Sequence, residues 1–284
     1  MPQVEPIRVR HLLTHTSGIT YGFHHAHPVD TLYRLRGFEW GTPNGADDAE
    51  VSRQLAAMPL LFQPGSEWNY GMSTDVLGAL VAAIAGKPLD EVLDERVFAP
   101  LGMAETSFGL RPDDDPALLA RLYGPGCTPL PAPMQQAALR RRPFLGGGGG
   151  LVSTAGDYLR FLEMLRSGGA TPSGDRVLGS RTLAHMMRNH LPGNVDLETY
   201  GRPLYAETPL RGVGFGLGFS VVTDPVRYGG PASPGDSSWG GAASTAFYVD
   251  PVEDLTVGFY TQLLPSSTLP IRTQLRQLVA QALV

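Results

Sequence analysis

A tyrosine that follows a Pro-Gly turn is the residue of this chain with the clearest capacity for chemistry. Pro64 and Gly65 favour a tight reversal, and a short aromatic run then ends at Tyr70, just ahead of a helical pattern. A phenol held beside a helix that the core fixes can relay a proton to or from a reacting group. The same pattern fits a packed aromatic residue at the end of a loop, and the motif alone does not separate the two interpretations.

A second candidate group lies in the last third of the chain, where Trp239, Gly240 and Gly241 precede a predicted strand. Small residues at the entry of a strand leave its edge open. An open edge offers backbone N–H groups to a ligand carbonyl. The sequence therefore predicts a place where the carbonyl of an ester or amide could bind.

Other reactive side chains lack the neighbours that their chemistry requires. Ser17 has no G-x-S-x-G elbow around it, and the single cysteine, Cys127, has no histidine nearby in sequence. His24, His25 and His27 do not have H-E-x-x-H spacing and have no cysteine or carboxylate cluster beside them. We expect local backbone bonding for Ser17, a surface loop for the histidines, and neither a metal nor a cofactor.

The composition is that of a soluble globular protein, with 42% apolar and 17% charged residues among 284. A net charge of -5 argues against nucleic acid as a partner, and Arg140-Arg141-Arg142 is interpreted as a solvated loop. No apolar run approaches membrane-spanning length, and the polar start at residues 1–6 does not resemble a signal peptide. The default expectation is a cytoplasmic protein whose true N-terminus is missing.

The helix predicted after Tyr70 positions the candidate phenol. Ser73 or Thr74 is expected to cap it, with Asp75 in its first turn, where a negative charge suits the helix dipole. Apolar residues recur at helical spacing from position 76 to Ile84, which is expected to face the core. Gly86 is expected to end the helix.

The remaining periodicity predicts an α+β chain. Helices are expected over residues 7–18, 50–58, 89–98, 154–168, 180–187 and from 270 onwards, the last with Leu278 on its buried face. Strands are expected over 215–222, 243–249 and 255–261, the last two joined as a hairpin by the turn at 250–254. Residues 20–50 are expected to be irregular and residues 109–143 to form a covering loop. Five consecutive glycines, 146–150, lack a P-loop ending and indicate close approach of backbones.

Four segments in order resemble motifs of the β-lactamase-fold serine hydrolases, which include class C β-lactamases, family VIII esterases, transesterases and D-amino-acid peptidases. Residues 9–18 are similar to V-R-x-L-L-T-H-T-S-G, and residues 64–70 to the second, tyrosine-bearing motif. Residues 148–157 are similar to G-G-L-x-S-T-x-x-D, and residues 239–241 stand where relatives have K-T-G or W-x-G. The resemblance covers essentially the whole chain, and the four segments together are far more specific than any one of them.

The resemblance implies one partial β-lactamase/transpeptidase-like domain over residues 1–284. It implies an antiparallel sheet flanked by helices and an all-helical lobe. The mainly helical and loop lobe is expected at residues 20–150, and the C-terminal strands and terminal helix at residues 210–284. The family's first strands and its nucleophile helix are expected to be missing.

The resemblance also implies a mechanism in which the serine of an S-x-x-K motif attacks an acyl carbonyl and forms an acyl-enzyme. Carried over by position, Tyr70 is the general base or proton relay. Trp239, Gly240 and Gly241 line the acyl side of the cleft, and the N–H of Ala242 is one oxyanion donor. The implied partner is a small acyl ester or amide; the oligomeric state is not predicted.

Two departures favour an ester over a β-lactam: Met72 stands where β-lactamases have asparagine, and Trp239 where they have lysine. A third concerns the nucleophile. The only lysine, Lys87, follows Ile84 by three residues, so the 284 residues contain no S-x-x-K. Without a neighbouring ammonium, Tyr70 is expected to stay protonated at neutral pH, because an unperturbed tyrosine titrates near pKa ~10.

Three hypotheses follow. The chain is the C-terminal part of an esterase-like serine hydrolase and is inactive alone; or it is a non-catalytic ligand-binding protein on the same fold; or it is a non-functional fragment. If a serine of this chain were nevertheless to act as nucleophile, Ser73 and Ser238 are the nearest candidates in sequence to the motifs.

Overall fold

A five-stranded antiparallel sheet forms the centre of the C-terminal half. The computed structural model describes residues 3–39, 41–43, 45–202 and 210–283. The strands lie in chain order: β5 (Val213–Phe215), β6 (Ser220–Val222), β7 (Ser237–Gly240), β8 (Ala246–Asp250) and β9 (Leu255–Phe259). Each strand therefore pairs with its neighbours in sequence, as in a meander.

The hairpin predicted at the end of the sheet is confirmed, whereas the strand predicted over residues 215–222 is wrong. Asp250 pairs with Leu255 across the β8–β9 turn. Residues 215–222 instead divide into β5 and β6, which are antiparallel partners. Gly218 has φ +97° in the turn between them, a conformation that glycine adopts without strain. The period-2 pattern does not reveal this turn because the turn residues include Leu217 and Phe219.

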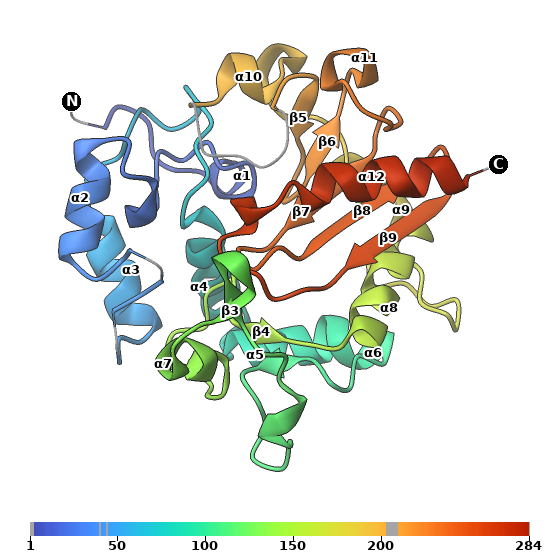
Figure 1. Ribbon diagram of the computed structural model, residues 1–284. Coiled ribbons are helices and arrows are strands. Elements are labelled where there is room, and N and C mark those ends of the chain that lie inside the picture. Colours follow the sequence, from blue (N-terminus) through green and yellow to red (C-terminus); the bar gives the residue numbers. More distant parts are fainter. Residues whose placement is uncertain (1–2, 40, 44, 203–209, 284) are drawn as a thin grey trace.

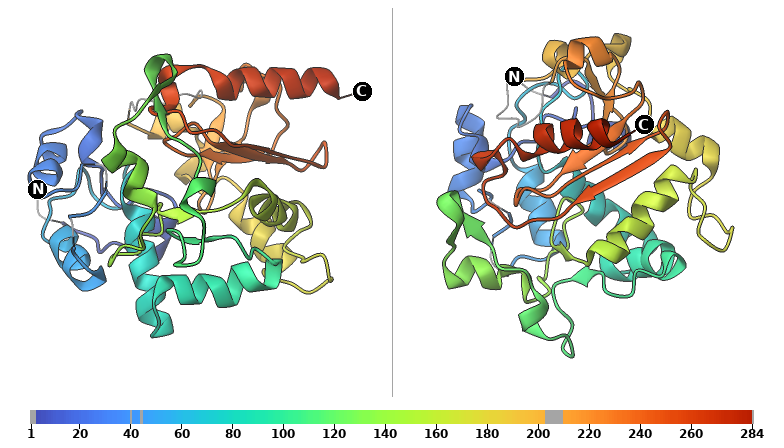
Figure 2. Two further views of the ribbon diagram at one scale, coloured as in Figure 1. Left: turned by 60° about the horizontal axis from the view of Figure 1, so that its bottom comes forward. Right: turned by 45° about the vertical axis from the view of Figure 1, so that its right-hand side comes forward.

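The sheet lies between two helices (Figures 1 and 2). Helix α12 (Ile271–Ala282) covers one face, and α8 (Ala155–Arg166) packs against β8 and β9 on the other. Thr154 caps α8 by accepting a hydrogen bond from the Asp157 N–H. The prediction for Leu278 is wrong, because its side chain is 65% exposed. The buried residue of α12 is Arg276.

Further helices and loops surround this sheet: α2 to α7 lie at the left and bottom of Figure 1, and α9 to α11 at its right and top. The helices are α1 (Val9–Leu13), α2 (Pro28–Leu35), α3 (Asp48–Ala56), α4 (Ser73–Ala85), α5 (Leu89–Leu93), α6 (Ala99–Leu101), α7 (Ala132–Gln135), α9 (Ser180–Met186), α10 (Leu197–Tyr200) and α11 (Pro225–Tyr228). A π turn, η2 (Asp94–Phe98), joins α5 to α6. Short 3-10 segments are η1 (Gly22–His24), η3 (Pro116–Leu118), η4 (Pro125–Cys127), η5 (Gln136–Ala138), η6 (Pro192–Asn194) and η7 (Ser266–Thr268).

Two small antiparallel pairs complete the secondary structure. β1 (Ser107–Phe108) pairs with β4 (Leu151–Val152), and β2 (Tyr123–Gly124) pairs with β3 (Thr128–Pro129). The stretches expected to be irregular thus contain short regular pieces, including α2 within residues 20–50. None of the helices in the described residues is both long and apolar enough to cross a bilayer.

Helix α4 forms where the sequence predicts it, but two details are wrong. Its N-cap is Met72, which makes no side-chain capping bond; Ser73 lies inside the helix, and its hydroxyl contacts another buried hydroxyl. Ile84, near the end of α4, is 77% exposed. The apolar face of this helix is therefore not buried along its whole length. The predicted end at Gly86 is confirmed, with φ +64°.

One ion pair is buried between the sheet and α12. Asp236, just ahead of β7, is fully buried, and both of its carboxylate oxygens accept hydrogen bonds from the Arg276 guanidinium. The guanidinium also lies 4.1 Å from the centroid of the Tyr248 ring. Because a buried charge that loses its partner carries a large desolvation cost, this pair fixes the position of α12.

We expect Arg276→Met to lower the free energy of unfolding by about 3–5 kcal/mol, because it leaves the Asp236 carboxylate buried and unpaired. Urea unfolding of the purified chain measures this. The double variant Asp236→Leu, Arg276→Met should recover most of the loss, since it removes both charges. Arg181→Met, at an exposed position, is the matched control and should stay within about 0.5 kcal/mol of the wild type. Equal stability of Arg276→Met and Arg181→Met would contradict the prediction.

Candidate functional site

The segment at residues 14–18 holds the loop that carries Tyr70. The carbonyl of His15 accepts a hydrogen bond from the Asn69 N–H at 3.0 Å, and the carbonyl of Thr16 accepts one from the Gly65 N–H at 2.7 Å. These bonds join two segments that are some fifty residues apart in sequence. The loop before α4 is therefore fixed at both ends by the same short segment.

The side chain of His15 fastens the same loop from within. It is buried, and burial lowers its pKa to about 3, so the ring is neutral near neutral pH. Its Nδ1 accepts from the Gly71 N–H at 3.4 Å, which places the ring proton on Nε2, 3.2 Å from the Thr74 hydroxyl. His15 thus donates to Thr74 and cannot take a proton from it. It is a structural residue and not a general base.

The serines weighed as nucleophiles are hydrogen-bonded to other hydroxyls. Ser17 and Ser73 are fully buried and share a 2.7 Å hydrogen bond. Ser238 lies 2.9 Å from the Ser220 hydroxyl. Among the described residues, none of these three serines has a histidine, lysine or carboxylate as a hydrogen-bond partner. The expected local bonding of Ser17 is confirmed, since its hydroxyl also accepts from the Ile19 N–H.

Tyr70 lies in an aromatic cluster. Its ring centroid is 5.2 Å from that of Trp239, 5.2 Å from Tyr21 and 4.9 Å from His15. Its backbone carbonyl is 2.7 Å from Nε2 of His24. Burial raises the pKa of the Tyr70 hydroxyl above its usual range, although the hydrogen bond with Trp239 acts in the opposite direction. The phenol is therefore protonated near neutral pH, as expected from the sequence.

A buried carboxylate lies on the other side of Tyr21. Asp75 accepts a hydrogen bond from the Tyr21 hydroxyl at 3.2 Å and from the Gly148 N–H at 3.3 Å. Burial raises its pKa to about 6. The sequence placed Asp75 in the first turn of α4, and this is confirmed. Its inward direction, toward the two other segments, is not visible in the sequence.

The glycine run at residues 146–150 passes directly over Asp75. A Cβ added at Gly148 would lie 2.8 Å from the Asp75 Oδ2, and one at Gly146 would collide with the same carboxylate. The close approach of backbones inferred from this run is confirmed at Gly147, where an added Cβ would collide with the carbonyl oxygen of Thr74 in α4.

Strand β7 brings Trp239 and Gly240 to an open edge. On one side, β7 pairs with β8 as far as Gly240. On the other, its pairing with β6 ends at Ser238, so the last two residues of β7 are not paired there. Gly240 lies under Arg272 of α12, whose guanidinium donates to the carbonyl of Gly241 at 2.8 Å. The structure thus brings Trp239 next to Tyr70 from a strand 169 positions further along the sequence.

The turn after β7 holds the expected oxyanion donor. The Gly241 N–H is occupied, because it donates to the Thr245 carbonyl at 3.0 Å. Ala242 is exposed, and its N–H makes no hydrogen bond within the part of the chain that the structure describes. Its role as a donor to a bound carbonyl stays a prediction.

A cavity of about 390 Å³ opens beside this cluster. Its lining includes Tyr21, the Asp75 carboxylate and Met72, which is almost fully buried. Met72, which stands where β-lactamases have asparagine, forms part of the apolar wall of this cavity, and its contact with a substrate stays a prediction. The glycines 146 and 148–150 line the same cavity.

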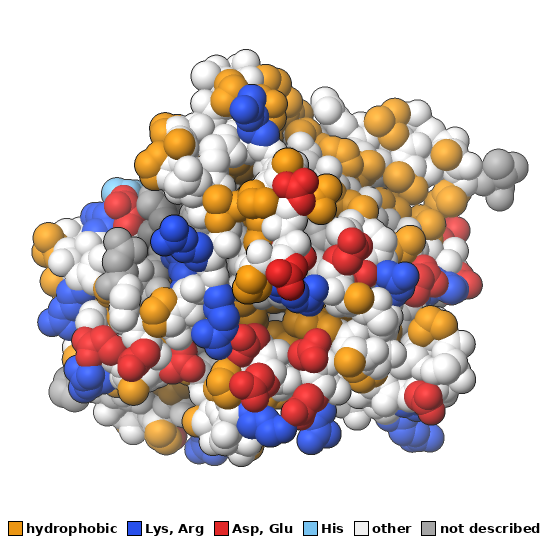
Figure 3. Space-filling view, turned by 90° about the horizontal axis from the view of Figure 1, so that it is seen from below, with side chains coloured by type: hydrophobic (Ala, Val, Ile, Leu, Met, Phe, Trp, Pro, Cys, Tyr) orange, Lys and Arg blue, Asp and Glu red, His pale blue; other side chains and the backbone are white. Residues whose placement is uncertain are grey.

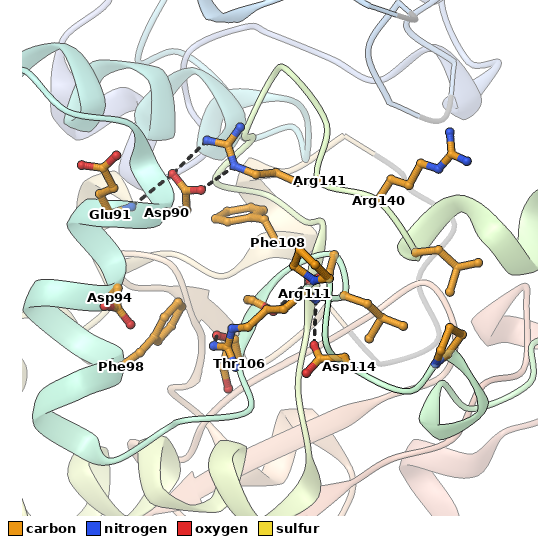
Figure 4. Close-up of a pocket in the computed structure, with 16 residues that line it drawn as sticks. Asp90, Glu91, Asp94, Phe98, Thr106, Phe108, Arg111, Asp114, Arg140 and Arg141 are labelled. Atoms are coloured by element: carbon orange, nitrogen blue, oxygen red, sulfur yellow. Dashed lines mark hydrogen bonds and ion pairs between the residues drawn. The ribbon is translucent and has the colours of Figure 1, made fainter.

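A larger cavity, of about 920 Å³, lies away from Tyr70 between α5 and the loop at residues 106–116 (Figure 4). Two arginines in it are paired: Arg141 contacts both oxygens of Asp90, and the Arg111 guanidinium donates to backbone carbonyls. Arg140 lines this cavity as well as the smaller one and has no partner among the described residues. Asp90 lies in the first turn of α5, whose N-cap is Pro88. Figure 3 shows acidic and basic side chains interspersed over the face seen from below in Figure 1. This cavity contains none of the predicted site residues.

Metal binding finds no support among the described residues, which contain no group of three or more metal-ligating side chains. His27 accepts from the Val29 N–H, and His25 lies 3.6 Å from Glu39. His24 contributes differently, by fixing the carbonyl of Tyr70.

Three residues near Tyr70 were not predicted from the sequence to lie at the site: Tyr21, His24 and Arg272. The run Tyr21-Gly22-Phe23-His24 contains the only available signal, an aromatic cluster inside a stretch expected to be irregular. Arg272 has no signal at all, because it reaches the site from a helix on the far side of the sheet.

Comparisons with known proteins agree with this geometry. The family model described as Beta-lactamase matches residues 2–281. Protein Rv1367c of Mycobacterium tuberculosis is 35% identical over 93% of this chain and 64% of its own length. Esterase EstB of Burkholderia gladioli is 33% identical over 88% of this chain and 63% of its own length. The chain thus spans slightly less than two thirds of these curated relatives.

Among solved structures, EstCE1, a hydrolase with promiscuous acyltransferase activity, superposes with a TM-score of 0.78. It is 29% identical, and the match covers 95% of this chain and 71% of that one. The chain belongs to the beta-lactamase family and has its β-lactamase/transpeptidase-like α+β fold. Its relatives include esterases.

The raised pKa of Asp75 predicts a pH dependence of stability. The folded protein holds this proton up to about pH 6, whereas the unfolded chain releases it near pH ~4. The folded state therefore binds more protons between these values, and this contribution to the free energy of unfolding falls as pH rises through the window. Asp75→Asn should remove it, so that the wild type loses about 3 kcal/mol relative to the variant between pH ~4 and ~7.

Urea unfolding of the wild type and Asp75→Asn at several pH values measures this difference. Asp113→Asn, on an exposed turn, is the matched control and should follow the wild type. A constant difference between the wild type and Asp75→Asn across the pH range would show that the buried carboxyl titrates normally.

Proposed function

We propose that this chain provides the proton-relay and carbonyl-binding half of an acyl-transfer site of the esterase type. The contact between Tyr70 and Trp239 beside the open end of β7 carries this proposal. The phenol hydroxyl and the indole N–H are neighbours there, and the N–H of Ala242, which has no partner among the described residues, follows the end of β7. An ester carbonyl bound there would have donors aimed at the oxygen on which negative charge develops during attack.

Two observations support an ester over a β-lactam as substrate. Met72 is buried in an apolar wall and offers no amide to bind a β-lactam side chain. Trp239 brings no positive charge for a β-lactam carboxylate. The names of two similar proteins, esterase EstB and the hydrolase EstCE1, point to the same class of reaction.

We further propose that the 284 residues do not form an acyl-enzyme by themselves. They contain no S-x-x-K, and Ser17, Ser73 and Ser238 are each hydrogen-bonded to another hydroxyl. The phenol of Tyr70 is protonated near neutral pH, because burial raises its pKa. A serine needs an adjacent base or a lowered pKa to act as nucleophile, and neither surrounds these three.

The 390 Å³ cavity favours a second candidate function, the binding of a small acyl ligand without chemistry. Cavities of about 300–1,000 Å³ hold small molecules in many proteins. Both candidates place the ligand beside Tyr21 and Met72. They differ in whether a longer product of the same reading frame supplies a nucleophile.

We expect the purified chain, with its mass confirmed from Met1 to Val284, to show no hydrolysis of p-nitrophenyl butyrate above that of Tyr70→Phe. A fluorophosphonate probe should label no serine. The longest product of the reading frame should hydrolyse the ester if it contains S-x-x-K. Tyr70→Phe should then lower its kcat by about 10²–10⁴-fold, the usual contribution of a general acid or base.

Each result separates the alternatives. Turnover by the 284-residue chain that Tyr70→Phe abolishes would contradict the proposed inactivity. A longer product with S-x-x-K that hydrolyses no ester would favour the binding protein. Phe161→Leu in α8 is a suitable control substitution, because it changes an aromatic residue that packs in the core below the sheet, away from Tyr70.

A further inference from the structure

Two arginines without partners lie at the cavity beside Tyr21. Arg140 and Arg142 both line the 390 Å³ cavity, and both are exposed. Within the described residues neither makes a hydrogen bond or an ion pair. The residue between them, Arg141, points elsewhere and is bonded to Asp90 at 2.5 and 3.0 Å. Figure 4 shows the Arg140 side chain directed away from Arg141 and Asp90.

The loop that carries these arginines is held in place. The Arg141–Asp90 pair fastens it to α5, and Gly109 packs so closely that a Cβ there would lie 2.6 Å from the carbonyl carbon of Arg140. Directly after the loop, Phe144 and Leu145 are buried. The guanidinium groups therefore extend from an anchored backbone, which lowers the entropy cost of ordering them around a ligand.

The rest of the cavity wall is mostly apolar. Met72, Phe108, Phe144 and Leu145 are each at least nine-tenths buried and line it. The other ionisable groups in the lining are Asp75 and Tyr21. The Asp75 carboxylate already accepts from the Tyr21 hydroxyl and the Gly148 N–H, and no ion pair joins it to an arginine in the described residues. The cavity thus has an apolar wall and two unpaired cations.

The cavity also adjoins the proposed reaction site. Tyr21 lines it, and the Tyr21 ring lies 5.2 Å from the Tyr70 ring. A ligand with its ester at Tyr70 could therefore place its acyl chain past Tyr21 and along Met72. The far end of that chain would then meet the arginines. Guanidinium groups bind carboxylates and phosphates through paired, charge-assisted hydrogen bonds.

We propose that Arg140 and Arg142 bind an anionic group, carboxylate or phosphate, at the far end of the acyl chain, so that the substrates are negatively charged acyl esters. This inference rests on the proposed function, because it assigns the cavity to the acyl part of the ester. It replaces the interpretation of the arginine run as a merely solvated loop. It also explains why two of the three arginines have no partner within the part of the chain that the structure describes.

Binding of three probes to the purified chain tests the proposal by isothermal titration calorimetry. The probes are monomethyl adipate, which is an anion, its neutral analogue dimethyl adipate, and hexyl phosphate. We expect at least one anionic probe to bind about tenfold or more tightly than dimethyl adipate, as charge-assisted hydrogen bonds imply. Added salt should weaken only the anionic probes. The tighter of the two anions identifies the head group.

The double variant Arg140→Gln, Arg142→Gln should lower the affinity for the preferred anion by about tenfold or more and leave that for dimethyl adipate unchanged. Arg121→Gln, Arg181→Gln is the matched control, since it removes the same charge from exposed positions outside the cavity. It should bind like the wild type. Urea unfolding of both double variants verifies that they fold.

Three outcomes would overturn the proposal: equal affinity of the wild type for charged and neutral esters, no binding of any probe, or equal losses in the two double variants. These outcomes are distinct from failure of the proposed function. Ester turnover by the 284-residue chain would contradict its inactivity and leave the anion preference intact. Loss of the anion preference would leave the assignment of Tyr70 intact.

Discussion

The hydrogen bonds between residues 14–18 and the loop before α4 are the constraint on which the candidate site depends. The carbonyls of His15 and Thr16 accept hydrogen bonds from backbone N–H groups of this loop, and the buried, neutral His15 ring accepts one from the Gly71 N–H. A protonated imidazole could not accept from the Gly71 N–H, so the low pKa of His15 is part of the same constraint. Tyr70 has a defined position because both its flanking backbone and its ring neighbours are fixed.

The placement of charge follows from burial. The Asp236 carboxylate and the Arg276 guanidinium are buried together and satisfy each other, which fixes α12 over the sheet. Asp75 is buried with no cationic partner among the described residues, and neutral donors from Tyr21 and Gly148 partly compensate. Its pKa rises because hydrogen bonds from neutral groups do not replace the hydration of a carboxylate.

The geometry around Tyr70 separates carbonyl binding from nucleophilic attack. The Trp239 ring contacts that of Tyr70, the cavity begins one ring further on at Tyr21, and the serines nearby are hydrogen-bonded to hydroxyls. An acyl substrate could therefore bind in an oriented way without reacting. Arg140 and Arg142, which have no partner among the described residues, would add a preference for negatively charged ligands to the proposed acyl cavity.

The sequence by itself determined the family, the order of the motifs, the helix after Tyr70 and the β8–β9 hairpin, because these depend on local spacing and turn chemistry. It also predicted Tyr70 and Trp239 as site residues, and the structure brings their rings into contact. Only the tertiary structure decided that Ser73 and Asp75 face inward, that Ile84 and Leu278 face solvent, and that residues 215–222 fold back as a hairpin. Those outcomes depend on which distant segment packs against each residue, and helical or alternating periodicity contains no information about the partner.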